Sequence, residues 1–230
     1  NYRKLEENLR FLRQETGVHV HADLIAGLPG EDLESFGRGF DRLLELGPQE
    51  IQVGLLKRLR GTPIAVHDRE WTMAYSPAAP YEVLKTRVLS FRDVQRLRRF
   101  SRYWDLVGNR GFFQETLPVL LRVDGSPFRS FMRFSDWLFE NEQATHRIAL
   151  LRLTELLFRY LAARGQDAQA LAGALFRDYS RDKKRAVPPF LAEHLARPIP
   201  LETVPQASIP ARQARHLAGS RTENRHPSPG

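Results

Sequence analysis

The sequence predicts an α/β fold, followed by an all-helical domain and a disordered tail. Helix, strand, helix and strand patterns alternate through residue 65, as in repeated α/β units. Between residues 66 and 197 the apolar residues recur almost only at helical spacing, and from residue 198 to 230 a segment rich in Pro, Ser and Arg shows no periodicity. We therefore expect three parts: 1–65, 66–197 and 198–230.

Length and composition are those of a soluble globular protein. The chain has 230 residues, of which 42% are hydrophobic and 27% charged, and a net charge of +8. No apolar run approaches the roughly 18 residues of a membrane span, and no secretion signal is recognisable, so we expect a cytoplasmic location and no membrane partner. The chain contains no cysteine, which excludes disulfides and thiolate-bound metal or iron–sulfur clusters held by its own residues.

The first 65 residues alternate between two helices and two strands. Residues 2–15 place Leu residues on one stripe of an amphipathic helix, and "VHVHADLIAG" then begins with period two and becomes continuously apolar, as in a buried parallel strand. After "LPG" comes an acidic helix start, and the helix stops before Gly47 and Pro48. The second strand, 51–56, follows. Because two strands cannot form such a sheet alone, we expect further strands to precede Asn1.

The first strand carries a polar face. Alternation directs His19, His21, Asp23, Ile25 and Gly27 to one side and only apolar side chains to the other. The His-x-His-x-Asp pattern is compatible with a metal site, but a fourth ligand is missing, and we predict no metal there. A substrate surface and an internal hydrogen-bond network both remain open.

The turn "GLPG" after this strand also has two interpretations. Its glycines offer a backbone without side-chain bulk at the strand's carboxyl end, where ligands bind in parallel α/β folds. Alternatively, Gly and Pro serve only the turn's conformation. It is not a phosphate loop, because the Gly-Lys-Ser/Thr pattern is absent and acidic residues follow.

The second part is predicted to be helical. Helices are expected over 81–107, 112–121, 127–140, 147–163 and 168–179. The first of them carries an arginine stripe, Arg92, Arg96, Arg99 and Arg102, which is either a solvated or acid-paired face or a surface for RNA. The apolar register of Phe100 and Trp104 favours core packing for these two rings.

Two segments together resemble a known fold. The pair "DLIAGLPGED" and "IQVGLLKRLRGTPI" is similar to the last two strands of the radical S-adenosylmethionine (SAM) fold, in the branch that carries an N-terminal cobalamin-binding domain. The segments "YSPAAPYEVLKT", "LRRFSRYWDLVGN" and "SPFRSFMRFSDWLF" resemble the helical C-terminal domain of unknown function of one group of these proteins. The resemblance implies that residues 1–65 are the C-terminal end of a partial TIM-type barrel.

The resemblance also implies cofactors and site residues. Ile25 would lie against the adenine of SAM, Gly27 would leave room for it and Leu56 would add contacts, whereas Asp23 stands where the family pattern begins with Gly. His21, Asp23 and Gln52 would line the substrate space. The family's cysteine triplet for its [4Fe-4S] cluster is absent here, so the cluster and cobalamin sites would lie upstream and this fragment would be inactive alone.

The implied activity is that of an enzyme in the intact parent protein. It would cleave SAM reductively to a 5′-deoxyadenosyl radical, with methyl transfer through cobalamin as one outcome, on an unknown substrate. A reductant protein would supply the electrons, no catalytic residue is identified in this chain, and nucleic acid is not an expected partner. The alternative is a basic helical module that binds RNA or protein without catalysis.

Overall fold

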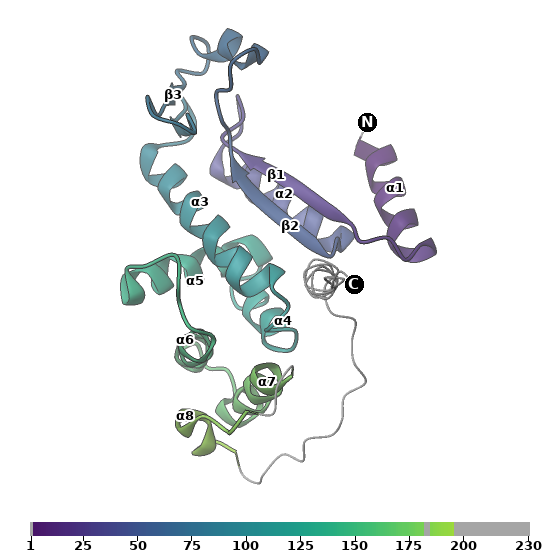
Figure 1. Cartoon of the computed structure of the whole chain (residues 1–230), viewed down its shortest axis with the longest axis vertical. Coiled ribbons are helices and arrows are strands. Elements are labelled where there is room, and N and C mark those ends of the chain that lie inside the picture. Colours follow the sequence, from purple (N-terminus) through teal and green to yellow (C-terminus); the bar gives the residue numbers. More distant parts are fainter. Residues whose placement is uncertain (1, 182–184, 196–230) are drawn as a thin grey trace, which may run out of the picture. The chain divides into compact units, whose positions relative to one another are not determined.

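The computed structural model describes residues 2–181 and 185–195 (Figure 1). All of them lie within one compact unit, Asn1–Arg197. The predicted disordered tail, 198–230, lies outside the described residues. Within the described part, none of the helices has both the length and the apolar character needed to cross a membrane.

The first four elements are a helix, a strand, a helix and a strand. They are α1 (Tyr2–Glu15), β1 (His21–Ala26), α2 (Leu33–Leu46) and β2 (Glu50–Leu55). The strands pair in parallel, with His21 opposite Glu50 and Ile25 opposite Gly54, which confirms the predicted parallel neighbours. β1 is shorter than predicted and begins at His21. Figure 1 shows α2 directly behind this pair.

Local chemistry fixes both ends of α2. At its start, the Asp32 carboxylate accepts the backbone N–H of Ser35, and the Ser35 hydroxyl accepts the N–H of Asp32 in return. At its end, Gly47 adopts the left-handed conformation with φ 66° and donates its N–H to the carbonyl of Leu44. The chain therefore turns sharply into β2.

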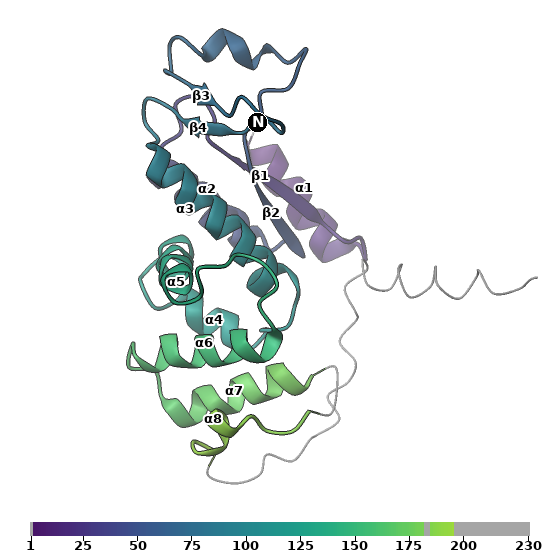
Figure 2. The ribbon, with the colours of Figure 1, turned by 60° about the vertical axis from the view of Figure 1, so that its left-hand side comes forward.

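A small antiparallel sheet follows, in the part that was predicted to be all-helical. A 3₁₀ helix, η1 (Pro63–His67), precedes β3 (Ala74–Tyr75) and β4 (Val83–Lys85). β4 is joined to the end of β2, because the Val83 N–H donates to the Leu56 carbonyl at 2.8 Å. Figure 2 shows β3 and β4 beyond one end of the β1–β2 pair. Strands of two and three residues are too short to show a period of two, and so the sequence pattern missed them.

The remaining elements are helical. They are α3 (Phe91–Trp104), the π-helical turn η2 (Asp105–Asn109), α4 (Thr116–Leu121), α5 (Pro127–Glu142), α6 (Leu150–Ala162), α7 (Ala168–Ser180) and α8 (Pro189–Ala192). The predicted helix over 81–107 was wrong at its start. The helix begins only after Ser90, whose hydroxyl accepts the N–H of Asp93 in a capping box, while 83–85 is strand.

Aromatic side chains join α2, α3 and α5 in one core. The ring of Phe40 meets those of Phe100 and Trp104 edge-on, with centroids 5.0 and 4.9 Å apart. Phe131 contacts the same two rings from α5, at 5.1 and 5.0 Å. Phe100 and Trp104 are buried, which confirms that they belong to the core. The second helix of the α/β part is thus packed directly on the helical part.

Candidate functional site

One face of the β1–β2 pair is exposed and polar. Ile51, Val53 and Leu55 are buried on the other face. On the exposed face the imidazole of His21 lies between two carboxylates, with Nε2 3.1 Å from Asp23 Oδ1 and Nδ1 3.3 Å from Glu50 Oε2. The register brings Gln52 beside Asp23. The structure therefore gathers His21, Asp23 and Gln52 on one face, as the sequence predicted, and adds Glu50, which the sequence reasoning had not singled out.

The same face has an apolar part. Ile25 is 37% exposed, and the Leu28 side chain in the following turn is 40% exposed. Gly54 lies opposite Ile25, and a side chain at Gly54 would begin 3.4 Å from Ile25 Cδ1. The glycine therefore keeps the surface beside Ile25 flat. Among the described residues, no cluster of His, Asp or Glu side chains is suited to hold a metal ion.

The outer edge of β2 is closed by side chains. The Asn109 side-chain amide accepts the Ile51 N–H at 3.2 Å and donates to the Ile51 carbonyl at 2.9 Å, and so it takes the place of a neighbouring strand. The Ser101 hydroxyl donates to the Val53 carbonyl at 2.5 Å. No further strand can pair along β2 without displacing these groups.

The outer edge of β1 is open. Val20 and Ala26 turn their carbonyls toward β2, where they accept the N–H groups of Glu50 and Leu56. Because backbone groups alternate along a strand, His21, Asp23 and Ile25 direct theirs to the other side. No residue of the described part hydrogen-bonds those groups.

The glycines of the turn after β1 accommodate neighbouring side chains. Gly27 has φ 91°, and a Cβ there would lie 2.6 Å from Cγ1 of Val83. Gly30 has φ 81°, and its Cβ would lie 3.0 Å from the ring of Trp71. The space predicted beside Gly27 is therefore filled by Val83, which supports the conformational interpretation of this turn. A cofactor contact by Gly27 stays a prediction.

The main chain of Leu56 is already paired. Its N–H donates to the Ala26 carbonyl at 2.9 Å, and its carbonyl accepts the N–H of Val83. The side chain is half-buried. Leu56 can therefore contact a ligand only through its side chain or through the second lone pair of its carbonyl. Its predicted contact with the cofactor also stays a prediction.

A half-buried carboxylate lies at the same turn. Burial raises the pKa of Glu31 above its usual range, and the N–H groups of Gly27 and Leu28 oppose this shift only in part. Glu31 Oε2 is enclosed and has no hydrogen-bond partner among the described residues. This acid follows the glycine turn directly in sequence, yet nothing in the pattern distinguished it from the other acids of the helix start.

A polar pocket follows the carboxyl end of β2. It has a volume of about 490 Å³ and is lined by Arg58, Arg60, Asp68, Met73, Tyr75, Ser76, Pro77 and Tyr81. Sequence reasoning missed this pocket. The available signal was the pair of arginines in "KRLR", directly after the apolar run of the strand.

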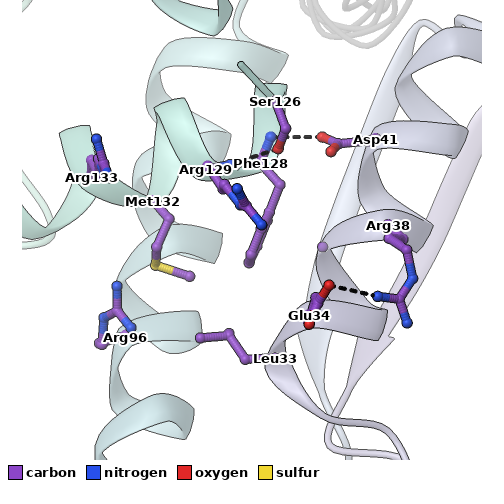
Figure 3. A pocket seen from close by; sticks show the side chains of 11 residues that line it. Leu33, Glu34, Arg38, Asp41, Arg96, Ser126, Phe128, Arg129, Met132 and Arg133 are labelled. Carbon is purple, nitrogen blue, oxygen red and sulfur yellow. Dashed lines mark hydrogen bonds and ion pairs between the residues drawn. The ribbon is translucent and has the colours of Figure 1, made fainter. Parts of the chain in front are cut away.

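A second concave region, also of about 490 Å³, lies where α2 meets α5 (Figure 3). The Phe128 ring covers Gly37, whose Cβ would lie only 2.4 Å from Cδ1 of that ring, and Asp41 accepts the Phe128 N–H at 2.6 Å. Two arginines at the rim are paired with acids, Arg38 with Glu34 and Arg133 with Asp124. These contacts make the region a junction between two helices.

The arginine stripe on α3 is partly internal. Arg96 forms a two-pronged contact with Asp136, with Nε and Nη2 at 3.0 and 2.8 Å from Oδ2. Arg99 lies 3.5 Å from the same carboxylate and over the ring of Phe139. Arg92 and Arg102 are exposed and make no ion pair with any described residue. Half of the stripe therefore serves packing between α3 and α5.

Residues 69–207 match the model of a family described as a protein of unknown function, DUF4080. This chain belongs to that family. The DUF4080 region supplies Trp71 and Val83, which cover the turn after β1, and Ser101 and Asn109, which close the edge of β2. None of the curated proteins is similar to the chain in sequence.

Proposed function

We propose that this chain is the carboxyl-terminal part of a cobalamin-binding radical SAM enzyme, in which β1 and β2 are the last two strands of a partial barrel and the DUF4080 region is the domain that follows. The observation that carries the proposal is the difference between the two sheet edges. Asn109 and Ser101 end the sheet at β2, whereas the backbone groups on the outer edge of β1 have no partner among the described residues. A last strand closed by the next domain, beside a strand open to earlier ones, is the arrangement that such a fragment requires.

Exposed apolar surface on α1 supports the same proposal. No side chain of this helix is buried, and Leu5 and Phe11 are 55% and 58% exposed. In a parallel fold, a helix that precedes a strand packs on the sheet beside it. A further strand along the open edge of β1 would give this helix a surface to cover.

The residues on the open face fit part of SAM. The flat patch formed by Ile25 and Gly54 suits an adenine ring. The ring would lie on the exposed Ile25 side chain, and Gly54 has no side chain that would prevent this contact. His21, Asp23 and Gln52 are the proposed substrate-lining residues. With a reduced [4Fe-4S] cluster, SAM would supply radical chemistry, and the cluster ligands must come from outside this chain because it has no cysteine.

The proposal is tested in the intact parent protein. Ile25→Asp is expected to weaken SAM binding by about tenfold or more, since a carboxylate replaces the apolar contact, with the cluster content unchanged. Val88→Asp is the control, because Val88 is similarly exposed, at 41%, and lies outside the strand pair. Binding is measured by equilibrium dialysis, and cluster content by absorbance. Equal affinities for the wild type and Ile25→Asp would remove Ile25 from the site.

The larger assignment has a separate test in the coding sequence that precedes Asn1. We expect it to encode the cysteine triplet and a cobalamin-binding domain, and a preceding sequence without any such triplet would end the enzyme proposal. The intact enzyme would also need a reductant protein as its electron source. Nucleic-acid binding by the α3 stripe is disfavoured, because Arg96 and Arg99 are engaged with Asp136.

A further inference from the structure

The pocket after β2 lies where parallel α/β folds bind ligands. Arg58 is three residues beyond the last residue of β2, and its N–H donates to the Tyr81 carbonyl at 3.0 Å. The pocket is thus built from the chain that leaves the strand and from the segment that returns to it. Ligands in such folds bind beyond the carboxyl ends of the strands, which is the end of β2 from which the chain enters this pocket.

The pocket is lined by two arginines but only one acidic residue. Arg58 pairs with Asp68, with Nη2 2.8 Å from Oδ2, and lies over the ring of Tyr75. Arg60 is exposed and makes no hydrogen bond or ion pair with any described residue. Two guanidinium groups against one carboxylate leave a net charge of +1 in the pocket. A guanidinium fork is the side-chain group best matched to two oxygens of a carboxylate or phosphate.

Tyr81 holds an unfavourable backbone conformation in this pocket. Its φ is 59°, in the left-handed region that a bulky aromatic residue rarely adopts. Two hydrogen bonds maintain it, from its own N–H to the Ala78 carbonyl at 2.9 Å and from the Arg58 N–H to its carbonyl. Strain of this kind is concentrated at functional sites, where it positions a side chain. Tyr81 is one of the residues that line the pocket.

We propose that this pocket binds an oxyanion group of the substrate, a carboxylate or a phosphate, through the guanidinium of Arg60, with Tyr81 forming one wall. The attribution to a substrate rests on the proposed function, whereas oxyanion binding itself does not. Asp68 does not repel the anion, because Arg58 already neutralises it. The substrate class is accordingly that of molecules with an anionic end held at the rim of the strands.

Binding is measured on the full 230-residue chain without SAM. Sodium phosphate and sodium acetate are titrated separately at constant ionic strength set with chloride, and the Nε–Hε signals of arginine are followed by NMR. Arg60→Gln is expected to weaken anion binding by about tenfold, because it removes at least one charge-assisted hydrogen bond. Arg60→Lys should recover part of the affinity, since it restores the charge without the fork. Arg102→Gln removes the same charge from α3 and should leave the affinity unchanged.

A second variant separates binding from folding. Tyr81→Gly relieves the left-handed strain and should raise the melting temperature while it weakens anion binding.

Saturation by phosphate, by acetate or by both supports the proposal and identifies the group that the pocket accepts. Absence of saturation with either anion, an unchanged affinity in Arg60→Gln, or an equal loss in Arg102→Gln overturns it. Because SAM takes no part, these results are independent of the test at Ile25.

Discussion

The strand part of the chain and its helical part differ in how completely they bury the apolar residues they carry. In the part of the chain that ends with β2, no side chain of α1 is buried. On the exposed face of the sheet, Ile25 is 37% accessible to solvent. In α5 and α6, Phe131, Phe134 and Leu156 are all fully buried. Apolar side chains on α1 and on the exposed sheet face are therefore open to solvent, whereas those at the centre of the helical part are enclosed. This difference is what the proposed function predicts, because α1 and the exposed sheet face would then pack against a further part of the barrel.

The largest expected effect tests this contrast with one pair of phenylalanines. Phe131→Ala should lower the free energy of unfolding by about 3–5 kcal/mol, because it leaves a cavity in the aromatic core. Phe11→Ala should change it by less than about 0.5 kcal/mol, because that ring is 58% exposed. Urea denaturation of both variants measures the two values.

The contrast can be broken in a defined way. If Phe11→Ala lowered the free energy of unfolding as much as Phe131→Ala, α1 would be packed in this chain. The contrast between the two regions would then be wrong. In the intact parent protein the proposed barrel would cover α1. The effect of Phe11→Ala should therefore grow there, while that of Phe131→Ala should not.

An intermediate effect is expected at the junction of the two regions. A Cβ at Gly37 would lie 2.4 Å from the Phe128 ring, so Gly37→Ala must displace that ring and should cost about 1–3 kcal/mol. Gly39, two residues on in α2, has no atom within 4 Å of its Cβ position, and Gly39→Ala should gain up to about 1 kcal/mol from helix propensity. Thermal unfolding compares the two. A gain in both variants would mean that α2 and α5 do not approach as closely as described.

How much the sequence predicts depends on the range of the interactions involved. α1, α5 and α7 were predicted to within a few residues because each shows an apolar stripe of its own. The predicted start of α3 was wrong because Leu84 and Val88 fall in the helical register although Val88 is 41% exposed and precedes the cap. The local pattern of apolar residues cannot distinguish a chance match to the helical register from residues that are packed on one face of a helix.

The candidate site was predictable only where it lies on a single strand. His21, Asp23 and Ile25 share a face by alternation alone, and the parallel register then adds Gln52. The closure of β2 by Asn109 joins positions 58 residues apart, and neither residue carries a local signal of the other. The pocket around Arg60 likewise forms only when the segment after β3 returns to the end of β2.

The smallest expected effect separates two buried tyrosines of the helical region. The Tyr103 hydroxyl donates to the Ala144 carbonyl at 2.8 Å, whereas the buried Tyr160 hydroxyl has no partner among the described residues. Tyr103→Phe should cost about 1 kcal/mol, because it removes that bond and leaves the carbonyl unpaired. Tyr160→Phe should be neutral or slightly stabilising, because it removes an unsatisfied polar group. Equal costs in urea denaturation would contradict the contrast in pairing.

Alkaline pH sharpens the same comparison. Burial raises the pKa of both Tyr103 and Tyr160 to about 12, while a tyrosine in the unfolded chain ionises near pH 10. The unfolded state therefore loses protons first, and the stability that each neutral ring contributes is complete below about pH 10 and declines as the pH rises toward 12. Removal of either hydroxyl should make this decline shallower by a similar amount, although the two variants differ at pH 7. Unfolding curves at pH 7, 10 and 11 thus separate hydrogen bonding, which distinguishes the two tyrosines, from burial, which they share.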